Sequence, residues 1–290
     1  MNLYFPGSAL NLSALYMIAG CGAALSIKSG ELNLGGEGQI YAGGLVSALL
    51  LAHLPLPPVI KLFAAMGAAF LISALLTLIS AFLKITRKAD FLFTTFITSA
   101  AIIPVIDGLI AGSARGHTGN LLATPFIPEN TRLPSIMPPS PLNASFIFSL
   151  NLCIILFYII YRTSWGRKVQ ILGISPSFAE YSGFSHNKLV YSSAIISGGL
   201  HGLCGATAVL GTYFTCHSGF YSGMGWNSFS AALIAGANPL LLIPSSLFMG
   251  FITTYSNKFA LYNNFGFDIS SLIQAVILFV ISFPLIRRRK

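Results

Sequence analysis

The longest uncharged stretch of this chain runs from Leu189 to Asn257, 69 residues without Asp, Glu, Lys or Arg. A membrane-crossing helix needs about 20 apolar residues, so this stretch alone accommodates more than one crossing. Of all 290 residues, 8% are charged and 54% hydrophobic, whereas soluble domains carry roughly 25% charged residues. Apolar segments of this density also differ from barrel strands, in which apolar and polar residues alternate. The sequence therefore predicts an all-α, polytopic membrane protein.

About eight long membrane-spanning helices are predicted from the apolar segments. They cover residues 8–27, 37–53, 58–83, 91–112, 144–161, 189–212, 239–256 and 267–286. Basic residues cluster at 84–88, 162–168 and 287–290, and such clusters mark the cytoplasmic side. Counting segments between the clusters places the N-terminus outside, the C-terminus in the cytoplasm and the Pro- and Ser-rich loop 113–143 outside.

Two irregular places interrupt these apolar segments. Only three long segments separate the second basic cluster from the third, although both clusters belong on one side. A short broken or re-entrant stretch, 226-WNSFSAALIAGANP-239, is expected to supply the missing reversal. The second place is 29-SGELNLGGEGQ-39, where glycines alternate with carboxylates and amides. Irregular backbone at membrane depth is tolerated only where it packs against protein or lines a cavity.

The connection 163–188 is long and is predicted to contain a short helix. Its signals are a good N-cap, a proline for the first turn and a glycine for the end, namely Ser175, Pro176 and Gly183. The two turns between them are too few to be stable alone. Phe178 and Tyr181 are three residues apart and share a face. We expect this helix to dock on a cytoplasmic partner; the alternative is that it lies on the membrane surface.

Sequence motifs for catalysis or nucleotide binding are absent, including G-x-x-x-x-G-K-[ST], H-E-x-x-H and G-x-S-x-G. We therefore predict no catalytic residue, no ATP site and no metal site in this chain. The four cysteines are Cys21, Cys153, Cys204 and Cys216. None forms a CxxC pair, and they are expected to be small buried side chains. The net charge of +9 comes from basic residues beside apolar segments, so nucleic acid is not an expected partner.

Asp107 and His201 are two ionisable residues that fall inside predicted spans. Asp107 lies near the outer end of segment 91–112, and both an ion or proton site and an interfacial position are open for it. His201 lies within 197-SGGLHGLCGA-206, whose small residues suit close helix packing. We expect His201 to be packed and hydrogen-bonded, with a path-lining role as the alternative.

Four segments, in this order, carry a resemblance to one family. They are 26-SIKSGELNLGGEGQ-39, 166-GRKVQILGISPSFAEYSG-183, 197-SGGLHGLCGATAVLG-211 and 225-GWNSFSAALIAGANPL-240. The chain resembles permease subunits of ATP-binding-cassette importers, in the group that includes ribose, branched-chain amino acid and nucleoside permeases. It is most similar to the nucleoside branch that works with lipoprotein binding proteins, and 32-LNLGGEGQIY-41 is also similar to spirochaetal flavin importers. Gln170, Ser175 and Phe178 stand where that branch usually has Arg, Asn and Ala.

The resemblance implies a single permease domain, 1–290, in a bacterial cytoplasmic membrane. It implies three partners: a second and paralogous permease subunit, an ABC ATPase that binds ATP and Mg, and a lipoprotein that delivers a small-molecule solute. A nucleoside-like or riboflavin-like solute is expected, with a sugar, a branched-chain amino acid or an ion-coupled secondary transporter as alternatives. The loop 163–188 resembles the coupling loop that contacts the ATPase, and this gives a role to Ser175, Pro176, Phe178, Tyr181 and Gly183.

The family fold also suggests what the polar residues at the two irregular places do. They are expected to line or brace the translocation route near the subunit interface, and they are Asn33, Glu37, Gln39, Asn227, Ser228 and Ser230. Two interpretations stay open for Glu31 and Glu37. Their carboxylates either face the route or cap and pin helix ends without meeting solute.

Overall fold

The computed structural model describes residues 3–116, 120–221 and 223–263, together with positions 272, 275, 276 and 279. The long helices are α1 (Tyr4–Ser29), α2 (Gly36–His53), α3 (Pro58–Arg87), α4 (Phe91–Ala111), α5 (Ser145–Arg162), α8 (His186–Ala208) and α10 (Pro239–Tyr262). The shorter ones are η1 (Glu129–Thr131), α6 (Ser164–Ile174), α7 (Pro176–Tyr181), η2 (Val209–Tyr213) and α9 (Met224–Ile234). The predicted all-helical fold is therefore confirmed over these residues.

Six helices of the described part are long and apolar enough to cross a membrane: α1, α3, α4, α5, α8 with its π-helical extension η2, and α10. The predicted span 37–53 corresponds to α2, whose first turn is polar and which is not among the six. The predicted span 267–286 and the basic cluster 287–290 lie outside the described residues, apart from the isolated positions. The described residues thus account for six of the eight predicted spans by length and composition.

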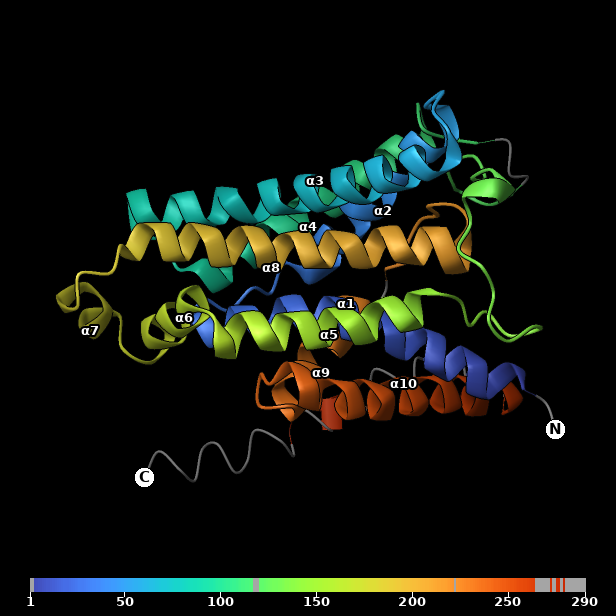
Figure 1. The fold of residues 1–290 in the computed structure, drawn as a ribbon. Coiled ribbons are helices and arrows are strands. Elements are labelled where there is room, and N and C mark those ends of the chain that lie inside the picture. The colour runs from blue at the N-terminus through green and yellow to red at the C-terminus, as the bar shows by residue number, and fades with distance from the viewer. Residues whose placement is uncertain are drawn as a thin grey trace.

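Helices α1 and α8 form the centre of the bundle (Figure 1). Of the most apolar window in each of these two helices, 83% is buried inside the chain, against 28% for α3 and for α5. Small residues allow the two central helices to approach closely. A Cβ atom on Gly22 of α1, for example, would lie only 2.6 Å from the carbonyl oxygen of Ser197 on α8. All four cysteines are buried, as predicted.

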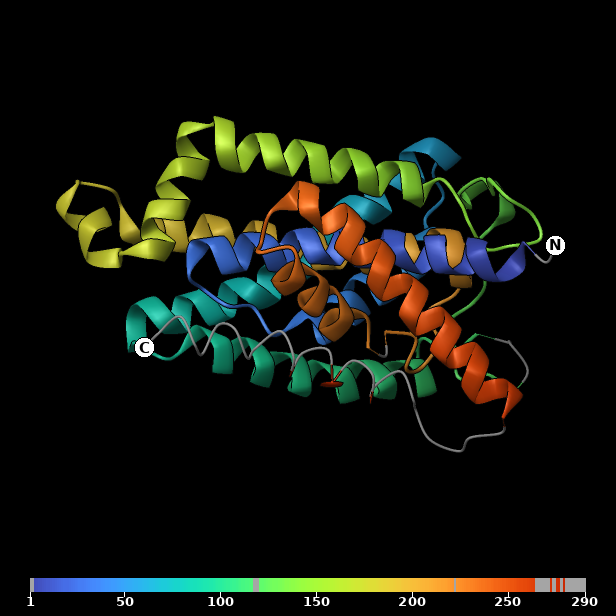
Figure 2. The same ribbon diagram turned by 90° about the horizontal axis from the view of Figure 1, so that it is seen from below.

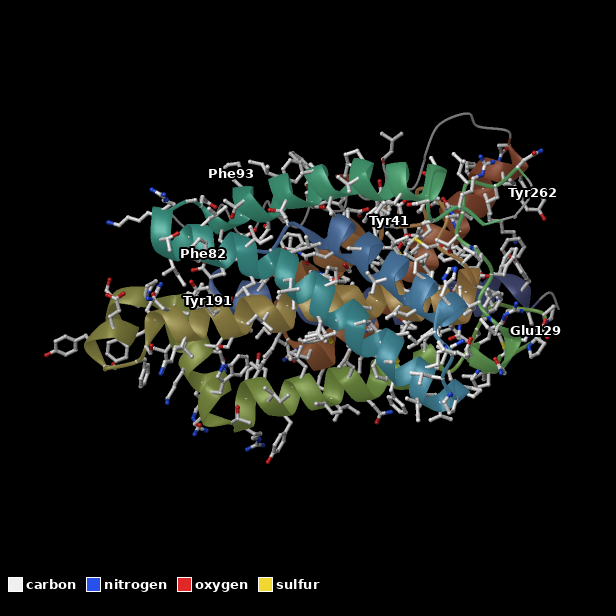
Figure 3. The ribbon with its side chains drawn as sticks, turned by 90° about the horizontal axis from the view of Figure 1, so that it is seen from above. Tyr41, Phe82, Phe93, Glu129, Tyr191 and Tyr262 are labelled. Atoms are coloured by element: carbon white, nitrogen blue, oxygen red, sulfur yellow. The ribbon has the colours of Figure 1, made fainter. Side chains whose placement is uncertain are left out.

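The two ends of the bundle differ in what they carry. Helices α6 and α7 lie at one end and the start of α1 at the other (Figure 1). Helices α3 and α5 both run toward the α7 end of the bundle. They end there, next to the basic residues of 84–88 and 162–168. Glu129 and Tyr262 mark the opposite end (Figure 3). The two described basic clusters therefore share one end, as the sequence argument requires.

The short stretch 226–239 is a half-length helix followed by a sharp reversal. Helix α9 has 11 residues, which is roughly 16 Å at 1.5 Å per residue and too short to cross a membrane. Gly236 and Ala237 both have positive φ angles, 59° and 55°, and the Asn238 side chain accepts from the backbone N–H of Leu240 to cap α10. Figure 2 shows α9 in the middle of the bundle, beside the start of α10.

Candidate functional site

The glycine-rich stretch after α1 forms an extended segment inside the protein. Residues 31–35 lie between the two helices: the Glu31 N–H still donates to the Ser26 carbonyl, the Gly35 carbonyl accepts from the Gln39 N–H, and α2 begins only at Gly36. Side chains of α4 replace some of the missing partners: Thr95 Oγ1 accepts from the N–H of Leu34 at 3.1 Å, and Ser99 Oγ accepts from the N–H of Gly38 at 2.7 Å. Because lipid supplies no acceptors, these hydroxyls are what make a helix break tolerable at this depth.

A cluster of amides and an imidazole lies beside this segment. Asn33 and Gln39 bond reciprocally, Asn33 Nδ2 to Gln39 Oε1 at 2.9 Å and Gln39 Nε2 to Asn33 Oδ1 at 3.0 Å. Asn33 Nδ2 also donates to Ser197 Oγ at 3.1 Å, and His201 Nδ1 lies 2.8 Å from Gln39 Oε1. All four side chains are buried. His201 is therefore packed and hydrogen-bonded, and the cluster is sealed within this chain.

Glu37 joins the first turn of α2 to the first turn of α9. Its Oε1 atom accepts from the backbone N–H groups of Gly225 at 2.9 Å and Trp226 at 3.2 Å. The first N–H groups of a helix have no partner inside the helix, and a carboxylate there is favoured by the helix dipole. The backbones almost touch, since a Cβ atom on Gly225 would lie 2.7 Å from the Glu37 nitrogen. Glu37 thus occupies the position expected of a residue that pins a helix end.

The polar residues of α9 do not join the cluster around Asn33. Ser228 Oγ donates to the carbonyl of Gly225 at 2.8 Å, and Ser230 Oγ donates to the carbonyl of Trp226 at 2.7 Å. Both hydroxyls therefore bond to their own helix, a common arrangement for Ser within helices. Asn227 is also buried. All six residues predicted to line or brace the route are buried within this chain.

Trp226 was not singled out by the sequence analysis. Trp226 is 36% exposed, and the centroid of its ring lies 6.4 Å from that of Phe96 on α4, which is 45% exposed. The sequence did contain a signal, because Trp in membrane proteins concentrates at the water interfaces, whereas this Trp follows a glycine in the middle of a long apolar stretch.

At the other end of the bundle, α7 has the predicted form. Ser175 Oγ accepts from the N–H of Phe178 at 3.3 Å, and Gly183 has a φ of 76° just beyond the helix end. Phe178 is 56% exposed and Tyr181 93% exposed, while Ala179 between them is buried. The short helix thus turns both aromatic side chains away from its own chain.

Helix α6 connects α7 to the extended segment. Gly173 near the end of α6 packs directly on the end of α1, since a Cβ atom there would lie 2.2 Å from the Lys28 carbonyl oxygen and 2.9 Å from the Gly30 nitrogen. Gly30 itself has a φ of 76° and begins the extended segment. Glu31 follows and forms an ion pair with Lys84 of α3. These two residues line a polar cleft of 660 Å³ at the α7 end.

Asp107 lies near the end of α4 that faces away from α7. Its Oδ1 atom accepts from Tyr41 OH at 2.6 Å and from Ser218 Oγ at 2.8 Å. The Tyr41 ring also stacks obliquely against Tyr221, with centroids 4.6 Å apart. Asp107 therefore ties α4 to α2 and to the loop before α9, as an interfacial carboxylate would.

Comparison with known proteins now decides the family. Residues 5–282 match the family described as the branched-chain amino acid transport system / permease component. The chain belongs to this permease family. It is a permease subunit of an ATP-binding-cassette importer.

Individual relatives agree with this assignment. The chain is 31% identical to the Probable riboflavin import permease protein of Treponema pallidum over 277 residues, covering 93% of this chain and 72% of the relative. It is 23% identical to the guanosine ABC transporter permease NupP of Bacillus subtilis, covering 98% and 83% of the two chains. It is 27% identical to NupQ, a second guanosine permease of that organism, with 88% and 82% covered.

A solved structure shows the same fold. The chain superposes on an ABC transporter described as metal-chelate type, in an inward-facing conformation, with a TM-score of 0.52. The match has 15% sequence identity and covers 96% of this chain and 85% of the other. The fold expected from the resemblance is thereby confirmed at the level of an all-helical ABC permease.

Proposed function

We propose that this permease carries an uncharged solute, nucleoside-like or riboflavin-like, that a binding lipoprotein delivers from outside. The relatives whose names concern riboflavin and guanosine support this solute class. Both molecules combine a flat nitrogen heterocycle with a hydroxyl-bearing sugar or polyol. Two guanosine permeases from one organism are both similar to this chain, which supports a heterodimer with a paralogous permease.

The observation that carries the solute proposal is the contact between Glu37 and α9. In transporters with broken helices, the positive N-terminus of a half-helix commonly faces an anionic group of the substrate. Here a carboxylate of the protein already accepts from the first N–H groups of α9. A solute carboxylate near this point would meet a like charge and no free donors. This arrangement favours an uncharged solute over a branched-chain amino acid.

The exposed aromatic face of α7 supports the proposed contact with a cytoplasmic ATPase. That partner binds ATP and Mg, and this chain supplies only the docking helix. A push on α7 reaches α6, and α6 is seated on the Gly30 turn through Gly173. The extended segment 31–35 leads from that turn to Glu37, and Glu37 holds α9. We propose that this contiguous set of contacts transmits ATPase movement to the middle of the membrane.

The proposed topology places the eight predicted long segments within one domain, 1–290, in a bacterial inner membrane. Helices α9 and α10 together enter and leave on the outer side, and the other seven segments cross, so the two termini lie on opposite sides. Helix α2 completes one crossing together with the extended segment 31–35, and the segment 267–286 supplies the last. The N-terminus and the loop 113–143 lie outside, where the lipoprotein docks. The C-terminal basic cluster 287–290 lies in the cytoplasm with α7.

Uptake into proteoliposomes tests this function. The permease pair, its ATPase and the binding lipoprotein would be reconstituted together, and radiolabelled riboflavin, guanosine and leucine would be offered separately. We expect ATP-dependent uptake of riboflavin or guanosine and background values for leucine. A non-hydrolysable ATP analogue should abolish the uptake. Leucine uptake at a comparable rate would contradict the proposal.

A further inference from the structure

The backbone of Trp226 is held from both sides. Its N–H donates to Glu37 Oε1 at 3.2 Å, and its carbonyl accepts from Ser230 Oγ at 2.7 Å. Its neighbours Gly225 and Asn227 are buried, whereas Trp226 itself is 36% exposed. The polar groups of the α2–α9 junction therefore fix the point from which this one ring projects.

The ring lies near the middle of the membrane. Glu37, which binds its backbone, follows Gly36, and a Cβ atom on Gly36 would lie 3.5 Å from the His201 ring. His201 is 15 residues into α8, roughly 22 Å along a helical segment of 28 residues. A Trp at this depth is far from the interfaces that such side chains usually occupy.

The indole N–H is the second unusual feature. The chain has two tryptophans, and the other one, Trp165, donates to Ser192 Oγ at 3.0 Å. Within the described residues, the Trp226 indole has no hydrogen-bond acceptor. Lipid chains offer none either. Neither the described residues nor lipid therefore satisfy this donor, which is exposed at membrane depth, and an acceptor on a passing solute can do so.

The ring of Phe96 is an aromatic neighbour of Trp226. The two rings are 6.4 Å apart and inclined at 59°, so they do not stack on each other. Because the indole N–H points outward in the plane of the ring, a flat heterocycle either stacks on the indole face or meets the N–H edge-on with a carbonyl or ring nitrogen. Purines and isoalloxazines carry both a large π-face and such acceptors.

We infer that Trp226 is a stacking platform for the heterocycle of the solute as it passes the middle of the membrane. The inference rests on the solute class proposed above and adds a residue to it. Glu37 and Ser230 act as positioning residues, because they hold the Trp226 backbone. The sugar or polyol is not recognised by this ring, so the platform serves either heterocyclic solute.

Uptake by substituted transporters is the first test, with riboflavin and guanosine as the probes. Stacking of a base on an aromatic ring is worth enough that its loss should lower uptake about tenfold in Trp226→Leu. Trp226→Phe keeps a ring without the donor and should fall between Trp226→Leu and the wild type. Phe93→Leu removes an exposed aromatic ring of α4 and should match the wild type. All three variants should still co-purify with the ATPase, which shows that they fold.

The outcomes separate this inference from the proposed function. Wild-type uptake of neither probe would overturn the solute class, and the platform would fall with it. Uptake of one probe, unchanged in Trp226→Leu, would overturn the platform alone. If Trp226→Leu no longer co-purifies with the ATPase, uptake by Trp226→Phe is compared with the wild type instead. Wild-type uptake and KM in Trp226→Phe would overturn the role of the indole N–H, and the cysteine test below would decide the role of the ring.

A cysteine at this position gives the second test. We expect Trp226→Cys to react with a water-soluble maleimide and to be protected by a saturating amount of the transported probe. The four native cysteines are buried and provide the background measurement in the wild-type chain. Crosslinking to the second permease without any maleimide reaction would assign the ring to a subunit interface. A cysteine that neither reacts with the maleimide nor crosslinks to the second permease would be assigned to lipid. Either of these two results overturns the inference.

Discussion

Two irregular regions of this permease differ in where their groups find partners: the α2–α9 junction finds them inside the chain, whereas α7 exposes its side chains to a partner. At the α2–α9 junction, an extended segment and two helix N-termini meet inside the protein, and their polar groups bond to one another through Asn33, Glu37 and Gln39. At α7, a two-turn helix stands at the end of the bundle and exposes Phe178 and Tyr181. Polar backbone at membrane depth has to be satisfied from within. A short helix outside the membrane can leave its stabilisation to another protein.

The largest effect should follow from Gly225→Ala, which attacks the closed junction. A Cβ atom at Gly225 would lie 2.7 Å from the Glu37 nitrogen and 2.9 Å from the Gly36 carbonyl carbon. These are backbone atoms, so neither helix can move aside without breaking the Glu37 contact. We expect a loss of about 3 kcal/mol and no monodisperse permease by size-exclusion chromatography in mild detergent.

Gly67→Ala is the matched control, because a Cβ atom at Gly67 on α3 would meet nothing within 4 Å. Alanine is the better helix former by about 1 kcal/mol, so this variant should be as stable as the wild type or slightly more so. Equal yields of folded protein from Gly225→Ala and Gly67→Ala would mean that the junction is loosely packed, and the contrast with α7 would disappear.

The two regions were not equally predictable from sequence. The form of α7 follows from local signals, since Ser175, Pro176 and Gly183 act on residues within one or two turns. The contacts of the junction join residues far apart, such as Asn33 with Ser197 and Glu37 with Gly225, which are 164 and 188 positions apart. Glycines and amides indicated an irregular place, but no local pattern names its partners.

The remaining differences have physical causes of the same kind. The six long helices were predictable because apolar length is a property of a segment alone. Ser228 and Ser230 remain predicted beside the route; their bonds to carbonyls of their own preceding turn could not be read from the sequence, because helical hydroxyls choose between such carbonyls and partners on other helices. Trp226 was overlooked because its neighbours are polar or small, and only their burial shows that its ring is the exposed one.

The second largest effect is expected at α7, from Phe178→Ala combined with Tyr181→Ala, and it concerns binding of the ATPase. Aromatic anchors at protein interfaces can lose more than about 2 kcal/mol of binding energy when truncated to alanine. We expect the ATPase to be lost from the purified complex, and ATP hydrolysis stimulated by loaded binding lipoprotein to fall at least about tenfold. The permease pair itself should form normally, because the two side chains are exposed and support no membrane helix.

Ser177→Ala is the matched control on the same short helix. Ser177 is exposed, but its small side chain offers no anchor, and ATPase co-purification should stay at the wild-type value. A double aromatic variant that keeps both the ATPase and its stimulation would show that α7 rests on the membrane surface. In that case α7 would need no protein partner, and it would not differ from the α2–α9 junction in this respect.

The smallest effect is expected from Glu37→Gln, which distinguishes hydrogen bonding from charge inside the junction. Gln retains an oxygen at the place of Oε1 and can still accept from Gly225 and Trp226, whereas Glu37→Leu leaves both buried N–H groups without a partner. Each unpaired group costs about 1–3 kcal/mol, so Leu should lower uptake at least about tenfold and Gln by no more than about threefold. Uptake would be measured at matched amounts of purified complex. If Gln were as inactive as Leu, the negative charge itself would be essential, and the junction would bind a proton or cation during transport. The α2–α9 junction would then depend on a bound proton or cation, just as α7 depends on the ATPase.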